Sequence, residues 1–351
     1  MILAWYFQKR IMASTLVVLV VLLGLSFTFE LIDEIGNASG SYGFAQALVY
    51  SLMQTPEALV RDLPLMGLIG ALVGLGSLAS SSEIVAARAA GWSLTRIVGL
   101  SAVPGFVLGL VGVLVAQWVV PFSSVTAENY KSIAQGRGEL NESVRGLWHR
   151  LPQGYMSLGS VNSRGEASAL NWFLFDQAQS LSQAGEAARG EIAVNDWRAI
   201  DSQTIDVLPD RIQASPVQDR QFQIDLGAAE LSLAQVDPSF LPPWSLWRLS
   251  QQLKADGLNA QRPQLYLYQT LFLPLSVVCL VLAAVGFILG PLRSSPIGTR
   301  LFIGVLVGLG FKLVQDVSGP VALVYGTHPS LAVGLPAALA LILAAAMFRR
   351  V

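Results

Sequence analysis

Six long runs of apolar residues, each able to cross a lipid bilayer, constrain this sequence more than any other feature. A membrane-spanning helix needs roughly 20 apolar residues, and each run is close to that length or longer. Only 13% of the residues are charged, against about 25% in soluble domains. The sequence therefore predicts an integral membrane protein with a six-helix bundle, whose spans cover about 11–31, 60–81, 97–122, 264–290, 298–323 and 331–348.

The first run has the basic flank of a signal peptide, because Lys9 and Arg10 precede it. Its uncharged stretch, Ile11–Phe29, is longer than a typical signal-peptide core, and acidic residues follow it without a convincing small-residue cleavage site. We therefore expect the first run to be a retained membrane helix.

The distribution of charge predicts the orientation, because basic residues collect on the cytoplasmic side of a membrane protein. The loop between the first two runs is mainly acidic, with one basic residue, Arg61, against Glu30, Asp33, Glu34, Glu57 and Asp62. The short segments predicted to be cytoplasmic hold a single acidic residue, Glu83, and eight basic ones: Lys9, Arg10, Arg88, Arg96, Arg293, Arg300, Arg349 and Arg350. Both termini, the 80–96 segment and the 292–299 turn should thus face the cytoplasm, and the insert between the third and fourth runs the opposite side.

The insert divides the chain into three parts: 1–129 with three spans, an extramembrane domain at 130–262, and 263–351 with three spans. Gln221–Leu226 alternates apolar and polar residues as a half-buried strand does. Weaker strand candidates are Tyr155–Val161, Ala169–Phe175, Glu191–Val194, Thr204–Leu208 and Glu230–Val236, separated by turn signals at Asn162–Gly165, Pro209-Asp210 and Ser215-Pro216. Many short strands favour an all-β sandwich or jelly roll. An amphipathic helix should follow at 245–254.

The segment from Ser80 to Arg96 has the pattern of a short helix at the membrane surface. Ser80 and Glu83 have the spacing of a capping box, Gly91 suits a left-handed C-cap, and Ser93 can cap the next helix. Two interpretations remain open: an ordinary loop helix on the lipid headgroups, or a coupling helix that a membrane protein offers to a cytoplasmic partner.

Motifs for catalysis are missing from the sequence. Gly308–Lys312 lacks the spacing of a phosphate-binding loop, and His149 and His328 lack the H-E-x-x-H spacing. No G-x-S-x-G elbow occurs, and the single cysteine, Cys279, excludes an intrachain disulfide and a cysteine metal site. We expect no enzyme activity, no catalytic residue, no metal site and no cofactor in this chain.

Small residues recur at four-residue spacing within the runs, which permits close helix contact in lipid. The pairs are Gly70/Gly74, Gly105/Gly109, Gly286/Gly290 and Gly304/Gly308. Lys312 and Asp316 lie four residues apart in the fifth run. Ionisable groups at membrane depth are costly, so this pair either faces a cavity or forms a structural ion pair in the bundle.

Several short motifs, in order along the whole chain, resemble the LptF/LptG permease family. They are Gly74–Ala79, Ser82–Val85 and Ala90–Trp92, then Gly146–Trp148 and Gly319-Pro320 with Leu323–Gly326. Gly290–Ser294 with Pro296, Gly298 and Arg300 is more diagnostic, and it favours the LptG branch.

The resemblance implies a subunit of a Gram-negative inner-membrane ABC transporter for lipopolysaccharide. Such a permease pairs with LptF around a central cavity, above a dimer of the ATPase LptB, which binds ATP and Mg. The lipid passes to LptC and then LptA through joined periplasmic jelly rolls. Here 80–92 would be the coupling helix, with Glu83 as an LptB contact and Ser82, Ile84, Arg88 and Gly91 around it.

The resemblance also implies gates formed by spans one and five, and a lipid path through the extramembrane domain. The cavity and gate candidates are Phe27, Phe29, Glu30, Ile32, Asp33, Leu65, Leu68, Leu301, Phe302, Val305, Leu306, Lys312 and Asp316. The path candidates are Trp148, Met156, Leu158, Phe173, Phe175, Phe222 and Ile224. Without the resemblance, the sequence favours an ordinary closed sandwich core for these last seven residues.

One departure from the family concerns the outer end of span one. Relatives place lysines there for lipid A phosphates, whereas Glu30 and Asp33 make this region acidic. Two hypotheses follow: a divalent cation bridges carboxylate and phosphate, or LptF makes the contact.

Two other functions remain alternatives to lipopolysaccharide export. The chain is either the permease of another ABC-type exporter, such as a lipoprotein-releasing one with four spans, or a membrane scaffold that transports nothing.

Overall fold

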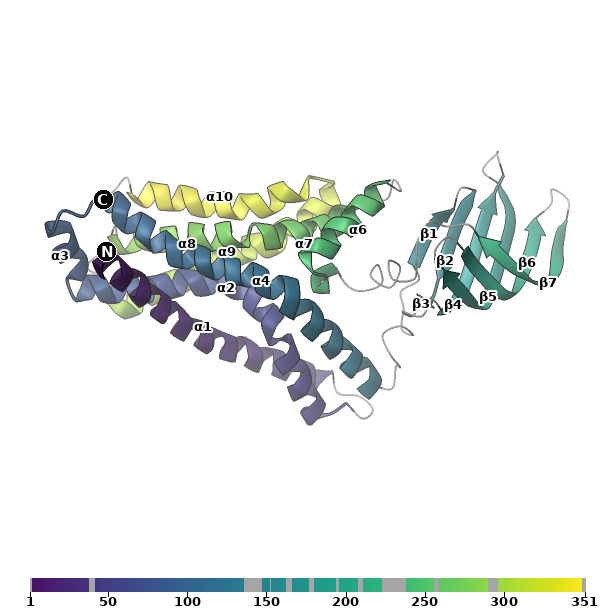
Figure 1. The fold of residues 1–351 in the computed structure, drawn as a ribbon, viewed down its shortest axis with the longest axis horizontal. Coiled ribbons are helices and arrows are strands. Elements are labelled where there is room, and N and C mark those ends of the chain that lie inside the picture. The colour runs from purple at the N-terminus through teal and green to yellow at the C-terminus, as the bar shows by residue number, and fades with distance from the viewer. Residues whose placement is uncertain are drawn as a thin grey trace.

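The structure is a computed structural model that describes residues 2–37, 42–135, 147–151, 153–161, 166–176, 180–193, 196–207, 211–222, 238–255, 259–289 and 296–348. A bundle of long helices carries a β-sheet beyond one end and the short helix α3 at the other (Figure 1). We call these the sheet end and the α3 end.

The long helices agree in position with the six predicted spans. They are α1 (Ile2–Gly36), α2 (Phe44–Ser80), α4 (Leu94–Ala134), α7 (Gln261–Leu271), α8 (Leu273–Leu289), α9 (Ile297–Tyr325) and α10 (Pro329–Phe348). Within the described residues, five single helices are long and apolar enough to cross a membrane. The α7–α8 pair, taken as one bent span, gives a sixth.

The fourth predicted span, over about 264–290, is bent: α7 and α8 meet at an angle of 50°. Pro274, the second residue of α8, has no N–H to donate, and its ring would clash with the Thr270 carbonyl in a straight helix. Gly109 of α4 lies against the bend: a Cβ there would lie 2.4 Å from the Pro274 Cα. The proline and the facing glycine therefore shape the fourth span together.

The second helix begins much earlier than its hydropathy predicts. Glu57, Arg61 and Asp62, which we expect in the loop between spans one and two, all lie within α2, and Asp62 is buried. The apolar run marks only the part of a helix at membrane depth, and a charged turn can continue the same helix.

Glycines lie where the long helices approach most closely, as the spacing predicted. A Cβ at Gly70 of α2 would lie 2.4 Å from the Thr15 Cα of α1. Cβ atoms at Gly304 and Gly308 of α9 would each lie 2.1 Å from a leucine side chain of α2, Leu72 and Leu65 respectively. Small residues thus join α1 and α9 to α2.

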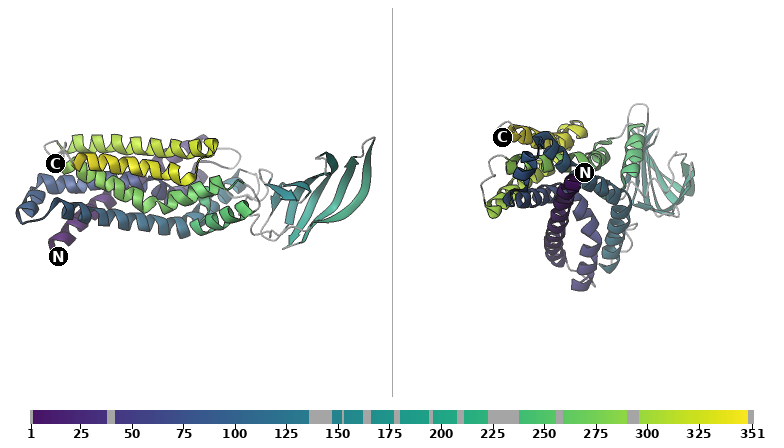
Figure 2. Two further views of the ribbon diagram at one scale, coloured as in Figure 1. Left: turned by 90° about the horizontal axis from the view of Figure 1, so that it is seen from above. Right: turned by 60° about the vertical axis from the view of Figure 1, so that its left-hand side comes forward.

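Seven strands form one antiparallel sheet, curved and twisted as Figure 2 shows. They are β1 (Leu147–Leu151), β2 (Gly154–Leu158), β3 (Ser160–Val161), β4 (Glu166–Phe175), β5 (Leu181–Ala193), β6 (Asp196–Val207) and β7 (Ile212–Phe222). The order is β1-β2-β4-β5-β6-β7, and β3 pairs with β4. A jelly roll needs two sheets; the described strands supply one, and the strand expected at 230–236 lies outside the described residues.

Two local predictions in this domain are wrong. Ser215-Pro216, expected as a turn, lies inside β7, an edge strand in which proline is tolerated. Most of β5 was missed, because 181–190 is rich in alanine and glycine. Gly185 of β5 is needed beneath the fully buried Trp172 of β4, since a Cβ there would lie 2.2 Å from the ring.

We expect Gly185→Val to destabilise the sheet domain by about 2 kcal/mol, because overpacking displaces the Trp172 ring. The measurement is the thermal midpoint of tryptophan emission and the protease resistance of the full chain in detergent. The control is Ala188→Val at an exposed position of the same strand. Equal stability of the two variants would contradict this packing.

Candidate functional site

The short helix α3 (Glu83–Ala89) lies at the end of the bundle farthest from the sheet (Figure 1). The predicted capping box is wrong. The Ser80 hydroxyl donates to the Ser77 carbonyl at 2.9 Å, and the N-cap is Ser82, whose φ of 62° is left-handed. Glu83 is the first helical residue; its carboxylate accepts hydrogen bonds from the Ser81 hydroxyl at 2.8 Å and from the Tyr6 hydroxyl at 3.4 Å.

The end of α3 confirms the sequence prediction. Gly91 has a φ of 89°, and its N–H donates to the Arg88 carbonyl at 3.0 Å. The Trp92 N–H donates to the Ala87 carbonyl at 3.1 Å, which completes a Schellman motif. Ser93 caps α4 by accepting from the Arg96 N–H at 3.3 Å.

Burial divides α3 into an anchoring face and a free face. Ile84 is only 5% exposed and packs in the main core of the bundle, so its side chain anchors α3 instead of facing a partner. Ser82, Val85 and Arg88 are exposed. The sequence did not predict Val85, which the alternation of buried and exposed positions along α3 identifies.

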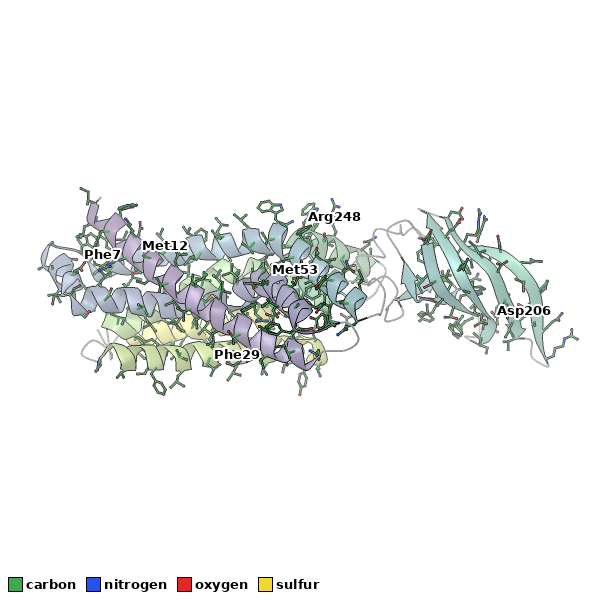
Figure 3. The ribbon with its side chains drawn as sticks, turned by 90° about the horizontal axis from the view of Figure 1, so that it is seen from below. Phe7, Met12, Phe29, Met53, Asp206 and Arg248 are labelled. Carbon is green, nitrogen blue, oxygen red and sulfur yellow. The ribbon has the colours of Figure 1, made fainter. Side chains whose placement is uncertain are left out.

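Aromatic contacts connect the α3 segment to α1 and α4. The Trp92 ring lies 5.4 Å from the Phe7 ring of α1, and the Arg96 guanidinium lies 4.7 Å from the Trp92 ring centre. Trp92 therefore connects the α3 segment to the first span, near the end of α1 where Figure 3 shows Phe7.

The predicted cavity residues fall into exposed and buried sets. Most are exposed or half-buried: Phe27, Phe29, Glu30, Ile32 and Asp33 on α1, Leu65 on α2, and Phe302, Val305, Leu306, Lys312 and Asp316 on α9. Leu68 is fully buried, because it packs beside Leu65 against Gly308 of α9. The Leu301 side chain lies outside the described residues.

Lys312 has an interhelical ion-pair partner, Asp62, that the local sequence pattern does not predict. Its Nζ lies 2.9 Å from Asp62 Oδ1 of α2 and 3.9 Å from Asp316 Oδ2. The Ser26 hydroxyl of α1 donates to Asp62 Oδ2 at 3.3 Å, and Arg61 Nε lies 3.5 Å from Asp62 Oδ1. Asp62 thus joins α1, α2 and α9 at one level of the bundle, and Lys312 is primarily an interhelical partner.

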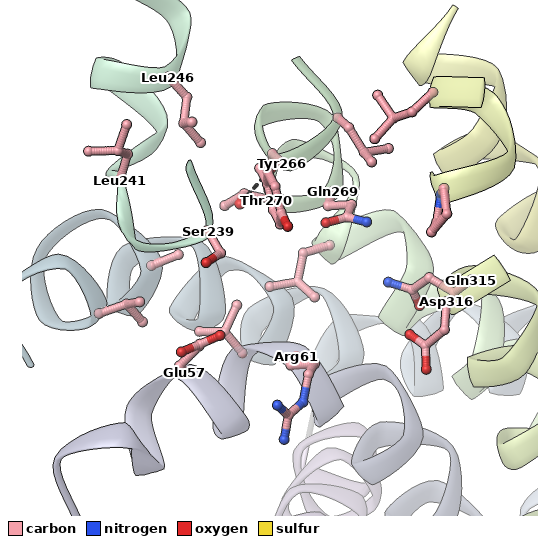
Figure 4. A pocket seen from close by; sticks show the side chains of 17 residues that line it. Glu57, Arg61, Ser239, Leu241, Leu246, Tyr266, Gln269, Thr270, Gln315 and Asp316 are labelled. Atoms are coloured by element: carbon pink, nitrogen blue, oxygen red, sulfur yellow. Dashed lines mark hydrogen bonds between the residues drawn. The ribbon is translucent and has the colours of Figure 1, made fainter. Parts of the chain in front are cut away.

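A pocket of about 350 Å³, with a mainly apolar lining and a few polar and charged side chains, opens beside this ion pair at the sheet end (Figure 4). Its walls come from α2, α4, α7, α9, the short helix η1 (Pro238–Phe240) and α6 (Pro243–Ala255). Glu57 and Arg61 line one side, and Gln315 and Asp316 line another. Only Asp316 among them was a predicted site residue.

The acidic end of α1 is partly neutralised within the chain. Glu34 is buried and lies 2.7 Å from Lys131 Nζ of α4, while Asp33 is exposed. The Tyr42 hydroxyl donates to Glu34 at 2.7 Å, and burial together with this bond raises the pKa of the phenol above its ordinary value. In the described parts of the chain, no three His, Cys, Asp or Glu side chains are grouped to hold a metal ion.

The predicted lipid-path residues lie on two faces of the sheet. Met156 and Leu158 are fully buried, and Phe222 packs with Trp172 at 5.2 Å. Phe173 and Phe175 alternate with buried Trp172 and are half-buried. The Trp148 side chain and Ile224 lie outside the described residues.

Comparisons with known proteins agree along nearly the whole chain. The family model "Lipopolysaccharide export system permease LptF/LptG" matches residues 5–350. The "Lipopolysaccharide export system permease protein LptG" of Escherichia coli (strain K12) is 30% identical over 340 residues, which are 95% of this chain and 94% of that protein. The protein of the same name from Haemophilus influenzae is 26% identical over 329 residues, 92% and 90% of the two chains.

Proposed function

The chain belongs to the LptF/LptG family of lipopolysaccharide export permeases, and from this premise we propose how its parts carry out export. It is an inner-membrane permease subunit that takes lipopolysaccharide from the membrane toward the periplasmic bridge. The observation that carries this function is the family match over residues 5–350, which includes the helices and the sheet domain. The five or six spans among the described residues disfavour the four-span exporter considered as an alternative.

We propose that ATP hydrolysis takes place in a partner. An LptB dimer binds ATP and Mg beneath the bundle, LptF is the second permease, and LptC followed by LptA receives the lipid. The α3 end then faces the cytoplasm, with both termini there, and the sheet is periplasmic. The basic residues near α3 support this orientation, as do the acidic residues toward the opposite ends of α1 and α2: Glu30, Asp33, Glu34 and Glu57.

In this proposal α3 is the coupling helix. Its exposed residues Ser82, Val85 and Arg88 receive the movement of the ATPase, and Ile84 holds α3 in the bundle core. Trp92 passes the displacement to Phe7 of α1.

The exposed faces of α1 and α9 would form the gates and the lipid cavity together with LptF. In the apolar stretch of α1 that could cross the membrane, only 6% of the residues are buried within this chain. In the corresponding stretch of α9 the share is 17%. Phe29, Ile32 and Phe302 are strongly exposed, at 64%, 62% and 65%. The same proposal includes a bundle of six spans in this chain. It also includes a jelly-roll domain whose interior covers the acyl chains of the lipid.

The test is co-purification of the ATPase with Glu83→Arg and Arg88→Glu, with Arg88→Lys as the charge-conserving control. We expect both charge reversals to reduce bound ATPase about tenfold, which corresponds to ~1.4 kcal/mol, and to remove lipid-stimulated ATP hydrolysis. Arg88→Lys should retain both.

Thr299→Glu, at the first turn of α9, tests whether the ATPase binds near the predicted cytoplasmic 292–299 turn instead of at α3. If Thr299→Glu releases the ATPase while both α3 variants retain it, α3 is not the coupling helix. If no ATPase co-purifies with the parent chain when the partners are co-expressed, the scaffold function is favoured.

A further inference from the structure

The short helix α6 has two distinct faces. Pro243, Leu246 and Ser250 are buried against the bundle. On the other face, Trp244 and Trp247 are 54% and 45% exposed, and their rings stack at 5.2 Å between centres. The neighbouring guanidinium of Arg248, labelled in Figure 3, lies 5.1 Å from the Trp244 ring centre.

The position of α6 along the bundle follows from its contact with α4. The backbone N–H of Trp244 donates to Gln117 Oε1 of α4 at 3.4 Å. Gln117 lies about 35 Å along the helix axis from Leu94, the first residue of α4, at ~1.5 Å per residue. A hydrocarbon layer is about 30 Å thick, and the headgroup layers extend it to about 40–45 Å. If α4 enters the bilayer at Leu94, the contact lies in the headgroup layer on the sheet side.

Further exposed aromatics lie at the same level of α4. Trp118 is 67% exposed and Phe122 is 77% exposed. Indole rings favour the membrane interface, where the ring is apolar and the N–H remains hydrated. Trp118, next to Gln117 in α4, therefore adds another exposed indole at the level of the α6 contact.

The charge of α6 indicates which kind of surface this helix binds. Arg248 and Lys254 are its only charged residues, so the helix is purely cationic. A guanidinium beside an indole ring can bind a phosphate while the ring inserts between headgroups. The position of α6 at the headgroup layer and its positive charge together favour a phospholipid surface over a protein partner.

We propose that α6 is an interfacial helix, with Trp244 and Trp247 inserted among the headgroups of the sheet-side leaflet and Arg248 bound to lipid phosphate. This contact fixes the point at which the chain returns from the sheet domain, directly before α7 and its bend. The sheet can then move while the entry to the fourth span stays at constant depth. The inference does not depend on the coupling role of α3.

The test is fluorescence quenching of the full chain in nanodiscs of phosphatidylcholine brominated either near the headgroup or near the chain end. Subtracting the emission of the Trp244→Phe/Trp247→Phe variant isolates these two tryptophans. We expect the difference emission to lose most of its intensity with shallow bromines and little with deep ones. The matched control is Trp197→Phe, because Trp197 is fully buried in the sheet, and its difference emission should respond to neither lipid.

Arg248→Gln tests the headgroup contact separately. Brominated phosphatidylglycerol should quench the parent more than brominated phosphatidylcholine, and the variant should lose this preference. If shallow bromines leave the difference emission unchanged, or if quenching disappears once the partner subunits are assembled, α6 does not contact lipid in the transporter and the proposal is overturned.

Discussion

Replacing Lys312 by methionine should destabilise the helical bundle by about 3 kcal/mol, because removing one partner of a largely buried ion pair leaves an uncompensated charge. Lys312 Nζ lies 2.9 Å from Asp62 Oδ1, and the Asp62 side chain is only 10% exposed. The remaining groups near Asp62 compensate weakly: the Ser26 hydroxyl is 3.3 Å away, and the Arg61 side chain is 53% exposed. The measurement is the free energy of unfolding in mixed detergent micelles.

A double-mutant cycle isolates this interaction. Asp62→Asn combined with Lys312→Met removes both charges, so it should recover about half of the ~3 kcal/mol lost by Lys312→Met alone. The control is Asp316→Asn, which should cost less than about 0.5 kcal/mol, because Asp316 is exposed and its carboxylate lies 3.9 Å from Lys312 Nζ. A larger effect for Asp316→Asn than for Asp62→Asn would show that the pair within α9 dominates.

The ion pair between Lys312 and Asp62 is a contact that the sequence alone does not predict. Hydropathy predicted the helices because lipid contact needs apolar residues over a fixed length. The spacing of Lys312 and Asp316 indicated an ion pair within one helix. Asp62 lies 250 positions earlier in the sequence, and no local pattern specifies which two helices pack together.

Other differences have similarly local causes. Pro274 indicates that the fourth span can kink, but the sequence does not specify the 50° angle between α7 and α8. Gly185 and its alanine-rich neighbours weaken the strand signal of β5, although the glycine is there because Trp172 covers it. At the end of α3, the predictions at Gly91 and Ser93 are confirmed, because each residue acts through its own backbone turn.

The joint between α1 and α2 explains why a helix that is mostly exposed can still be positioned. Phe7, Ile11 and Thr15 are the buried residues of α1 near the α3 end, and Glu34 is buried near the sheet end. Gly70 of α2 lies directly against the Thr15 backbone, so α1 is held tightly there. Between Thr15 and Glu34 the α1 residues are exposed or half-buried, and Ser26 is tied to α2 by its hydrogen bond to Asp62. The proposed gate role of α1 needs this combination of a fixed point and an exposed length.

We therefore expect Gly70→Leu to separate α1 from α2 and to cost at least about 2 kcal/mol of stability, because overpacking at a helix joint forces the backbones apart. Even a Cβ at this position would lie 2.4 Å from the Thr15 Cα, and a backbone atom cannot move aside as a flexible side chain can. The measurements are the free energy of unfolding and lipid-stimulated ATP hydrolysis in the assembled transporter. Both should fall, since displacing α1 also separates Phe7 from Trp92.

Gly24→Leu is the matched control, because among the described residues no atom of another helix lies within 4 Å of a Cβ placed at Gly24 of α1. This change should preserve stability or raise it by up to about 1 kcal/mol through helix propensity. If Gly70→Leu behaves like Gly24→Leu in both measurements, α1 is not held at this joint. The proposed displacement of α3 must then reach the proposed lipid cavity through α2 and α9, along the contacts that Gly304 and Gly308 make with Leu72 and Leu65.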